Sequence, residues 1–465
     1  MVITNQPREA GTTNFVNKMK NNKIIINKFG GDIMSSPEKI KLAIQEITNQ
    51  IKNGQKPIMV VSALKGITDE LVEVLKKVAI SKNFFLNSFV KKISQAHHNF
   101  CQNILKNPGK LLEKIDRFLE EMEDDLKTLQ KYGDIKIVKD KILSCGEIPA
   151  SYIFATLLED AGVKAKSLTG GEIGIITDNN FMDANIIWEK SADRVQKNLN
   201  KLITQKLVPV ITGFNGKTSM GQITTLGRGG SDTTATFLGA VLNSYKIKLW
   251  KSVPGVLSAD PRIVKQAKTI SKITYNEAEE SGQVLHDKAI RFLKKSDLEA
   301  EVCFIKNPKI KTIIKRNVTG KKDVKMINSK EKLTLLEVRS PQVEQYGFLY
   351  KISEMISRRG INMVLIRNTR DALYIVIENS QESPGLYKEI EEFGSRLKIE
   401  EVAMVSLVGN LEWQQANDFN QLLIKLNHNP AMGAFPYREC VRMEALINPK
   451  NVERTVRALH GELIK

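Results

Sequence analysis

Two glycine-containing segments carry the residues best suited to hold anions. The first is Lys28-Phe29-Gly30-Gly31. Glycines at the end of a strand let backbone amides approach an anion closely, and a lysine just before them adds a positive charge, so the segment suits a phosphate. A tight turn beside a surface lysine gives the same pattern, and this segment alone does not separate the two interpretations.

The second segment is TTLGRGGSDTTA at residues 224–235. Its glycines keep the loop clear of side chains, while Ser231, Asp232 and Thr233 are typical N-cap residues for a following helix. The free amides and the dipole at a helix start favour an anion, and Arg228 can offer a planar fork to a carboxylate. The pattern predicts a carboxylate site, although a capped helix after an ordinary loop explains it equally well.

The elements that would position these segments alternate between strand and helix. Residues 23–28 and 57–63 are β-branched runs ending in glycine turns, and residues 37–52 between them have helical spacing. This βαβ unit implies a parallel sheet. The pattern resumes with helices at 148–161 and 233–242 and strands at 208–212 and 247–250. Ligand sites in such sheets lie at the carboxyl ends of the strands, where the glycine turns are.

Two further regions have a different character. Residues 84–131 predict a helical segment packed on the sheet, with His97 and His98 on its surface. After a lysine-rich boundary at 308–330, short strands and helices follow the ferredoxin-like order, about twice over. The expected strands are 333–339, 362–367, 373–378, 403–408 and 441–447, and the expected helices are 348–358, 385–396, 416–426 and 452–463.

Composition narrows the class of protein. The 465 residues suggest about three domains of roughly 150 residues, and 42% apolar residues exclude a disordered chain. Lys and Arg outnumber Asp and Glu by 70 to 52, but the lysines are scattered, which argues against a nucleic-acid groove. The four cysteines form no CxxC pair or zinc spacing, so we expect reduced thiols and no metal site. No apolar stretch reaches the roughly 18 to 20 residues of a membrane helix, and we expect a cytoplasmic protein with a flexible tail at residues 1–22.

The order of the motifs identifies a family. They are KFGG at 28–31, VSA at 61–63, GITD at 66–69, SCGE at 144–147, GGE at 170–172, TDNNF at 177–181, PVITGF at 209–214, TTLGRGGSDTTA at 224–235, PGV at 254–256, ADPR at 259–262 and LH at 285–286. Together they resemble an aspartokinase of the amino-acid-kinase family. The resemblance implies a three-layer α/β fold with a mainly parallel central sheet over residues 23–310. It also implies paired ferredoxin-like (ACT) α+β domains over residues 326–465.

The resemblance also assigns roles to residues. Lys28, Gly30 and Gly31 would hold the phosphates of ATP, with Mg²⁺ bound largely by ATP, and Asp232 would orient Lys28. The aspartate pocket would comprise Ser62, Thr68, Glu147, Arg228 and Ser231, with Arg228 on the α-carboxylate and Glu147 near the ammonium. Residues 251–262 would wrap the nucleotide through Lys251, Ser252, Leu257 and Arg262.

Four positions depart from the pattern expected of the family. Asp32 follows the first glycines where a small hydroxyl residue is usual, and Ser252 stands where an aspartate is common. Ser281-Gly282-Gln283 replaces Gly-Ala-Lys in a shortened segment, and Asp287 replaces a proline. A carboxylate beside a phosphate site is electrostatically unfavourable unless it faces away.

The implied activity is transfer of the γ-phosphate of ATP to the β-carboxylate of L-aspartate, giving 4-phospho-L-aspartate for lysine, threonine and methionine synthesis. The departures leave two alternatives open: a related kinase with another carboxylate acceptor, or a catalytically impaired amino-acid-binding regulatory protein. We expect a homodimer or larger assembly held through residues 330–465. Because 367–372 and 428–438 lack serine-rich turns, and Arg367 and Arg370 would repel a lysine side chain, we expect weak or absent lysine inhibition.

Overall fold

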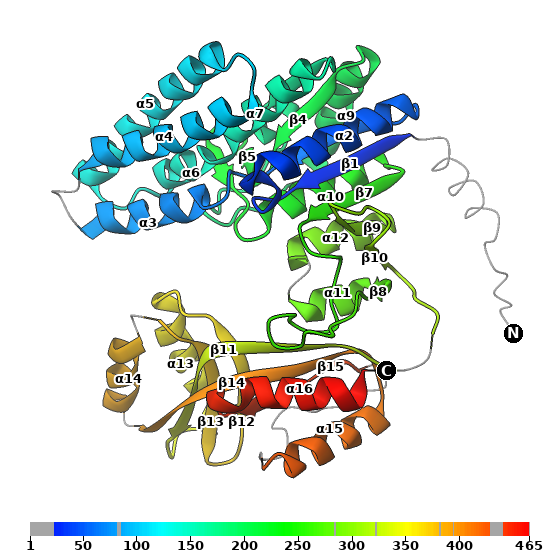
Figure 1. Cartoon of the computed structure of the whole chain (residues 1–465). Coiled ribbons are helices and arrows are strands. Elements are labelled where there is room, and N and C mark those ends of the chain that lie inside the picture. Colours follow the sequence, from blue (N-terminus) through cyan, green and yellow to red (C-terminus); the bar gives the residue numbers. More distant parts are fainter. Residues whose placement is uncertain are drawn as a thin grey trace, which may run out of the picture. The chain divides into compact units, whose positions relative to one another are not determined.

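The computed structural model describes residues 23–80, 85–282, 285–320, 323–380, 383–393, 395–427 and 440–464. These residues form two compact units (Figure 1). The first comprises the described residues up to Val256 together with Thr269–Val318, and the second comprises Leu257–Lys268 together with the residues from Thr319 onward. The expected tail at 1–22, the loop 428–438 and Gln283 lie outside the described residues. None of the described helices is long and apolar enough to cross a membrane.

The first unit is built on an eight-stranded sheet in the order β3-β4-β2-β1-β7-β9-β10-β8. All neighbouring strands are parallel except β9 and β10. The strands are β1 (Ile24–Phe29), β2 (Lys56–Val61), β3 (Ala165–Leu168), β4 (Val208–Thr212), β7 (Lys246–Lys251), β8 (Lys272–Thr274), β9 (Ala300–Phe304) and β10 (Lys311–Lys315), beside a small hairpin of β5 (Asn215–Lys217) and β6 (Ile223–Thr225).

Helices cover both faces of this sheet, which confirms the predicted three-layer α/β fold. One face packs against α2 and α7, and the other packs against α9 and α10, with α12 against α10. The helices of the unit are α2 (Pro37–Lys52), α3 (Ile67–Ile80), α4 (Leu86–Ile104), α5 (Gly109–Tyr132), α6 (Lys136–Ser144), α7 (Glu147–Asp160), α8 (Gly170–Ile173), α9 (Trp188–Thr204), α10 (Gly230–Leu242), α11 (Tyr275–Ser281) and α12 (Asp287–Ser296), with a 3-10 turn η1 (Ile33–Ser35).

The predicted helical segment is two helices, α4 and α5, separated at residues 105–108. The expectation that His97 lies on the surface is wrong. Its side chain is buried, and its Nδ1 bonds the carbonyl of Ile93 at 2.9 Å. His97 lies four residues from both Ile93 and Cys101, which are also buried, so the helical period already placed it on the apolar face.

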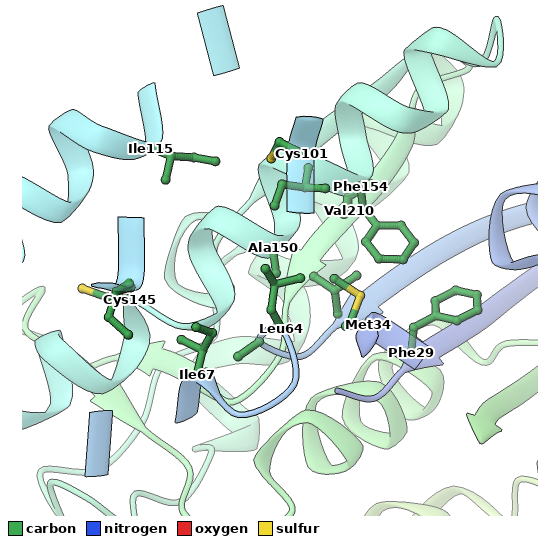
Figure 2. Close-up of a cluster of buried hydrophobic side chains, with 14 of the residues drawn as sticks. Phe29, Met34, Leu64, Ile67, Cys101, Ile115, Cys145, Ala150, Phe154 and Val210 are labelled. Atoms are coloured by element: carbon green, nitrogen blue, oxygen red, sulfur yellow. The ribbon is translucent and has the colours of Figure 1, made fainter. Parts of the chain in front are cut away.

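The end of β1 is held by the largest apolar cluster of the first unit (Figure 2). Phe29 stacks on Phe154 of α7 with ring centroids 5.8 Å apart. It also stacks on Trp250 of β7 at 6.0 Å. All three rings are fully buried. The strand end that carries the first glycine turn is therefore fixed by aromatic packing against two neighbouring elements.

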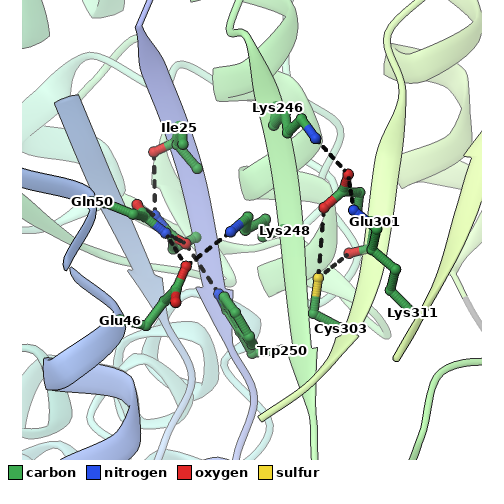
Figure 3. Close-up of polar contacts among 10 residues, drawn as sticks. Ile25, Glu46, Gln50, Lys246, Lys248, Trp250, Glu301, Cys303 and Lys311 are labelled. Atoms are coloured by element: carbon green, nitrogen blue, oxygen red, sulfur yellow. Dashed lines mark hydrogen bonds and ion pairs between the residues drawn. The ribbon is translucent and has the colours of Figure 1, made fainter. Parts of the chain in front are cut away.

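A buried polar network lies beside these rings and ties β1 to β7 and α2 (Figure 3). The Asn27 amide exchanges hydrogen bonds of 2.9 and 3.0 Å with Gln50, and Trp250 Nε1 donates to Asn27 Oδ1 at 3.0 Å. Side chains alternate along a strand, so Asn27 and Phe29 both face α2 and α7. Lys28 between them is directed to the opposite face, where α10 packs.

The second unit contains an antiparallel five-stranded sheet in the order β12-β13-β11-β14-β15. Two of its strands are 16 residues long and contribute to two separate apolar cores, as expected for two ferredoxin-like halves that share strands. Its elements are β11 (Val324–Arg339), α13 (Phe348–Arg358), β12 (Met363–Asn368), β13 (Ala372–Glu378), α14 (Ser383–Glu392), β14 (Arg396–Leu411), α15 (Trp413–Lys425), β15 (Cys440–Ile447), a 3-10 turn η2 (Pro449–Asn451) and α16 (Val452–Leu463).

The helix expected at 385–396 is wrong at its end. It stops at Glu392, and Arg396 begins β14. The strand expected at 333–339 is only the last part of β11, and the strand expected at 403–408 is only the middle of β14. The missed part of β14 is largely exposed and charged, so it lacks the apolar alternation that identifies a half-buried strand.

One segment expected in the kinase domain belongs to the second unit. Within Leu257–Lys268, the side chains of Ala259 and Val264 are buried in the core formed with α16. The Ser258 carbonyl accepts a hydrogen bond from Ile327 N at 2.8 Å, and Ser258 Oγ bonds His460 Nε2 at 2.9 Å. Apolar burial and these bonds make the segment part of the second unit.

Candidate active site

A pocket of about 600 Å³ opens in the first unit where β1 and β2 end and α10 begins. It gathers most of the residues that the sequence singled out for chemistry. Those that line it are Lys28, Gly31, Ser62, Thr68, Glu147, Arg228, Ser231 and Asp232. They come from five separate stretches of the chain, so the fold brings them together.

A buried ion pair lies at one side of the pocket. Lys28 Nζ is 2.7 Å from Asp232 Oδ1, and the two side chains are only 7% and 10% exposed. Burial lowers the pKa of Lys28, and the charge of Asp232 opposes that effect. Burial alone would raise the pKa of Asp232, but the charges of Lys28 and Lys251 outweigh it and leave the pKa below its ordinary value. The pair therefore presents a fixed positive group beside an ionised carboxylate.

The glycine turn after β1 packs against the Lys28 ammonium. The Gly30 carbonyl accepts hydrogen bonds from Ile33 N at 2.9 Å and Met34 N at 3.2 Å, which closes a tight turn. A Cβ atom at Gly30 would lie 3.3 Å from Lys28 Nζ. A larger residue at this position would therefore crowd the ammonium and force the lysine side chain to shift by a few tenths of an ångström.

The second glycine segment begins α10 differently from what the sequence predicts. Ser231, Asp232 and Thr233 were expected as N-cap residues, but the N-cap is Gly229, at φ +72°, without a side-chain cap. A left-handed glycine starts the helix, so Ser231 and Asp232 lie in its first turn. Their side chains are thus available to the pocket: Asp232 pairs with Lys28, and Ser62 Oγ donates to Ser231 Oγ at 2.9 Å.

Glu147 and Arg228 line the pocket apart from this ion pair. Glu147, the first residue of α7, is 3% exposed, and its Oε1 accepts from Ala63 N at 3.3 Å. Its Oε2 is buried without a hydrogen-bond partner among the described residues. Burial raises the pKa of Glu147 to about 8, although the Ala63 amide and the charge of Lys28 act in the other direction. Arg228 is exposed and pairs with no carboxylate of the described chain.

The four residues predicted to bind nucleotide beyond the glycine turn divide into two pairs. Lys251 is close enough to Lys28 and Asp232 for its charge to lower both of their pKa values. Ser252 donates a hydrogen bond to Asp32, which lines the pocket. Leu257 and Arg262 belong to the second unit and are not among the lining residues, and Arg262 pairs with Asp260. Their role at the nucleotide stays a prediction.

Two of the four departures from the family pattern meet in this structure. Asp32 carries a carboxylate where a hydroxyl was expected, Ser252 carries a hydroxyl where a carboxylate was expected, and the two side chains are hydrogen-bonded. Lys39 lies 3.9 Å from the same carboxylate and donates to the Asp32 carbonyl at 3.0 Å. The pocket edge thus has one carboxylate and one hydroxyl, as the family pattern predicts, but each stands at the position where that pattern has the other.

Two apolar residues that line the pocket were not among the site residues predicted from the sequence. Met182 and Phe214 both line the pocket with positive φ, 76° and 72°, which is uncommon for residues other than glycine. Phe214 closes the PVITGF motif, so its place in the family pattern could have identified it. Nothing in the local sequence indicates Met182.

The comparisons with known proteins agree with this fold and site. The amino acid kinase family matches residues 23–304 of the chain. The chain therefore belongs to the amino acid kinase family. Aspartokinase 1, chloroplastic, of Arabidopsis thaliana is 30% identical over 411 residues, which cover 83% of this chain and 70% of the relative. The aspartokinase of Geobacillus stearothermophilus is 29% identical over 357 residues, 75% of this chain and 73% of the relative. Within the family, the chain belongs to the aspartokinases.

Two solved structures show the same fold over nearly the whole chain. Escherichia coli aspartokinase III, in complex with lysine and aspartate, has a TM-score of 0.79 at 23% identity, covering 95% of this chain and 100% of that chain. Clostridium acetobutylicum aspartate kinase has a TM-score of 0.70 at 23% identity, covering 94% and 99%. The predicted family and fold are confirmed.

The contact between Asp32 and Ser252 predicts compensation between two substitutions. Ser252→Asp alone would place two carboxylates side by side, and we expect the KM for ATP to rise about tenfold. Asp32→Thr combined with Ser252→Asp restores one carboxylate and one hydroxyl, and its KM should return to within about threefold of the unmodified enzyme. Steady-state kinetics at saturating aspartate measure both values.

A matched control uses another carboxylate that lines the pocket. Asp69→Thr combined with Ser252→Asp removes one negative charge without relieving the contact with Asp32. It should stay as impaired as Ser252→Asp alone. Equal recovery by both double variants would show that only net charge matters and would refute the pairing.

Proposed function

We propose that this pocket binds L-aspartate against the phosphates of ATP and that the chain transfers the γ-phosphate to the β-carboxylate, giving 4-phospho-L-aspartate. The observation that carries the proposal is the division of charge in the pocket. A buried ion pair, Lys28 with Asp232, lies on one side, while Glu147 and Arg228 are left to receive an ammonium and a carboxylate. An amino acid has both of these groups.

The residues suit a reaction that depends on position and charge. An oxygen of the β-carboxylate attacks the γ-phosphorus, the bond from that phosphorus to the bridging oxygen breaks, and ADP leaves with the electron pair. The protein supplies no covalent nucleophile in this scheme. Lys28 neutralises charge on the transferring group, and Asp232 fixes its ammonium in place. Glu147 and Arg228 hold the backbone end of the acceptor, so that its side-chain carboxylate points toward Lys28.

Magnesium would be held by the nucleotide in this proposal. The described residues contain no group of three or more His, Cys, Asp or Glu side chains arranged to hold a metal ion. Kinases of this kind use ATP with Mg²⁺, which neutralises phosphate charge when bound. Asp32 follows the glycine turn and lines the pocket, and its carboxylate would accept a hydrogen bond from a water of the hydrated ion.

The decisive test contrasts Lys28 with Arg228. Lys28→Met removes a charge that acts mainly in the transition state, so kcat should fall by roughly 10² to 10³ with a smaller change in aspartate KM. Arg228→Ala removes a bidentate partner of the α-carboxylate, so aspartate KM should rise instead. ATP turnover with a panel of amino acids measures both and reveals any other acceptor.

A lysine on a neighbouring strand provides the control. Lys248 lies on β7, pairs with Glu46 at 2.8 Å and is absent from the pocket lining. Lys248→Met should keep kcat within about twofold. Unchanged turnover in Lys28→Met would remove Lys28 from the mechanism, and a normal aspartate KM in Arg228→Ala would make Arg228 an ordinary loop residue.

The raised pKa of Glu147 predicts a pH dependence of aspartate binding. Below a pKa of about 8 the empty pocket holds Glu147 protonated, whereas the substrate ammonium favours the carboxylate. Binding must then release a proton, and kcat/KM for aspartate should rise about tenfold per pH unit from about pH 6.5 and level off above about pH 8. Glu147→Gln should abolish this slope and raise aspartate KM. A flat profile for the unmodified enzyme would contradict the assignment.

We also propose that the protein is cytoplasmic and that it assembles with further copies of itself. We expect a homodimer or larger assembly held through residues 330–465. β12 is an edge strand of the five-stranded sheet, and Tyr346, Leu349 and Tyr350 are exposed apolar side chains at the start of α13. Exposed strand edges and apolar patches favour pairing with a second copy.

Light scattering of the full chain tests this assembly. Tyr350→Glu should lower the measured mass, whereas Phe85→Glu, on an exposed aromatic of the first unit, should leave it unchanged. In an activity assay of the same samples, added lysine should inhibit ATP turnover weakly or not at all. Arg370, in the loop after β12 and 3.9 Å from Glu344, places a positive charge there that would repel the lysine side chain. A monomeric full chain would contradict the first expectation, and strong inhibition at micromolar lysine would contradict the second.

A further inference from the structure

Asp140 is a buried carboxylate that the chemistry of the pocket does not use. It lies on α6, one helix before Glu147, and is fully buried. Met182 N donates to both of its oxygens at 3.0 Å, and Thr225 Oγ1 donates to Oδ1 at 2.5 Å. These three hydrogen bonds are made by uncharged donors. Burying an ionised group without a cation is costly, so a local role should account for it.

The two donors come from different walls of the pocket. Met182 lines the pocket in a left-handed conformation, which a long side chain rarely adopts without an external contact that fixes it. Thr225 ends β6 and is followed by Leu226, Gly227 and Arg228. Asp140 thus binds both the loop that carries Met182 and the strand that leads into the arginine.

The two walls are also bonded to each other. Ala184 N donates to the Thr225 carbonyl at 2.9 Å, and Lys288 Nζ donates to the carbonyls of Asp183 and Leu226 at 2.9 and 3.3 Å. A Cβ atom at Gly227 would overlap the Asp183 carboxylate, so the glycine loop rests directly on the loop with Met182. A shift in either wall therefore moves the other.

We propose that Asp140 is a positioning residue for the acceptor side of the pocket. It holds the Met182 loop and the start of the Arg228 loop in a fixed relation to Glu147, which follows on the next helix. This inference rests on the proposed function, since it assigns Arg228 and Glu147 to the amino-acid substrate. Lys28 and the glycine turn after β1 make no contact with Asp140, so the effect should fall on aspartate and not on ATP.

The test is Asp140→Asn in the full chain. The amide places an N–H group against Met182 N–H at one of the two oxygen positions. We expect aspartate KM to rise about tenfold or more, with ATP KM within about twofold. Amide hydrogen exchange should increase in peptides covering residues 178–185 and 223–230. Thr225→Val removes one bond only and should raise aspartate KM about threefold.

A structural control separates positioning from loss of stability. Ser191 is equally buried, accepts from Ile176 N at 2.9 Å and donates to the Ile176 carbonyl at 3.0 Å. Ser191→Ala removes buried hydrogen bonds near the same loop without touching the pocket. It should lower Tm and leave aspartate KM unchanged.

The outcomes decide the inference in each case. An aspartate KM within about twofold in folded Asp140→Asn, or an equal rise in ATP KM, would overturn it. If Asp140→Asn does not fold, Thr225→Val decides, and an unchanged aspartate KM there would overturn it. If the unmodified enzyme does not phosphorylate aspartate, the proposed function fails, and the exchange data then decide whether Asp140 fixes the two loops.

Discussion

The ion pair between Lys28 and Asp232 is the interaction on which the site depends. An exposed pair of this kind would contribute little to stability, and a buried one costs desolvation that the attraction between the charges repays only with good geometry. The two residues are far apart in the sequence, and their pairing requires β1 and α10 to be packed against each other. A pair of apolar side chains at these two positions would make the folded protein at least as stable. The charges are therefore not needed for stability, as expected of groups that serve a function.

The position of Lys28 follows from the residues on either side of it. Asn27 is bonded to Gln50 and Trp250, and Phe29 stacks on Trp250 and Phe154, so both neighbours are fixed on one face of the sheet. The strand alternation then leaves Lys28 a single direction, toward α10. The aromatic packing and the amide network thus fix the strand that carries the charge on the other face. Asn27 is tolerated in the core because its amide is hydrogen-bonded to Gln50 and Trp250.

The sequence predicted the elements well where the signal was local. The βαβ opening, its helix at 37–52 and the glycine turn all depend on residues close together in the chain, and the structure has them where expected. Local patterns failed where a distant contact determined the conformation. Ser231 and Asp232 have the composition of a helix cap, but Gly229 takes that position and leaves them to Ser62 and Lys28.

The same reason explains the residues that the sequence could not indicate. Met182 has positive φ, and its backbone N–H donates to Asp140, which lies 42 residues earlier in the chain. Asp32 and Ser252 look like two unrelated departures, because only the pairing of β1 with β7 brings the strand ends that precede them together. A property of two positions at once cannot be found by examining each position separately.

The chain between β7 and β8 joins the pocket to the second unit by covalent continuity. β7 ends at Lys251, Ser252 follows, and from Leu257 the chain packs into the core of the second unit before returning at Thr269. The excursion is closed at its base by bonds from Ile270 N to the Val256 carbonyl at 2.8 Å and from Ser258 N to the Lys268 carbonyl at 2.9 Å. Because Ala259 and Val264 are buried in that core, the segment cannot follow the first unit independently of the second. The residues between Lys251 and Leu257 are therefore a short covalent link from the edge of the pocket to the core around α16.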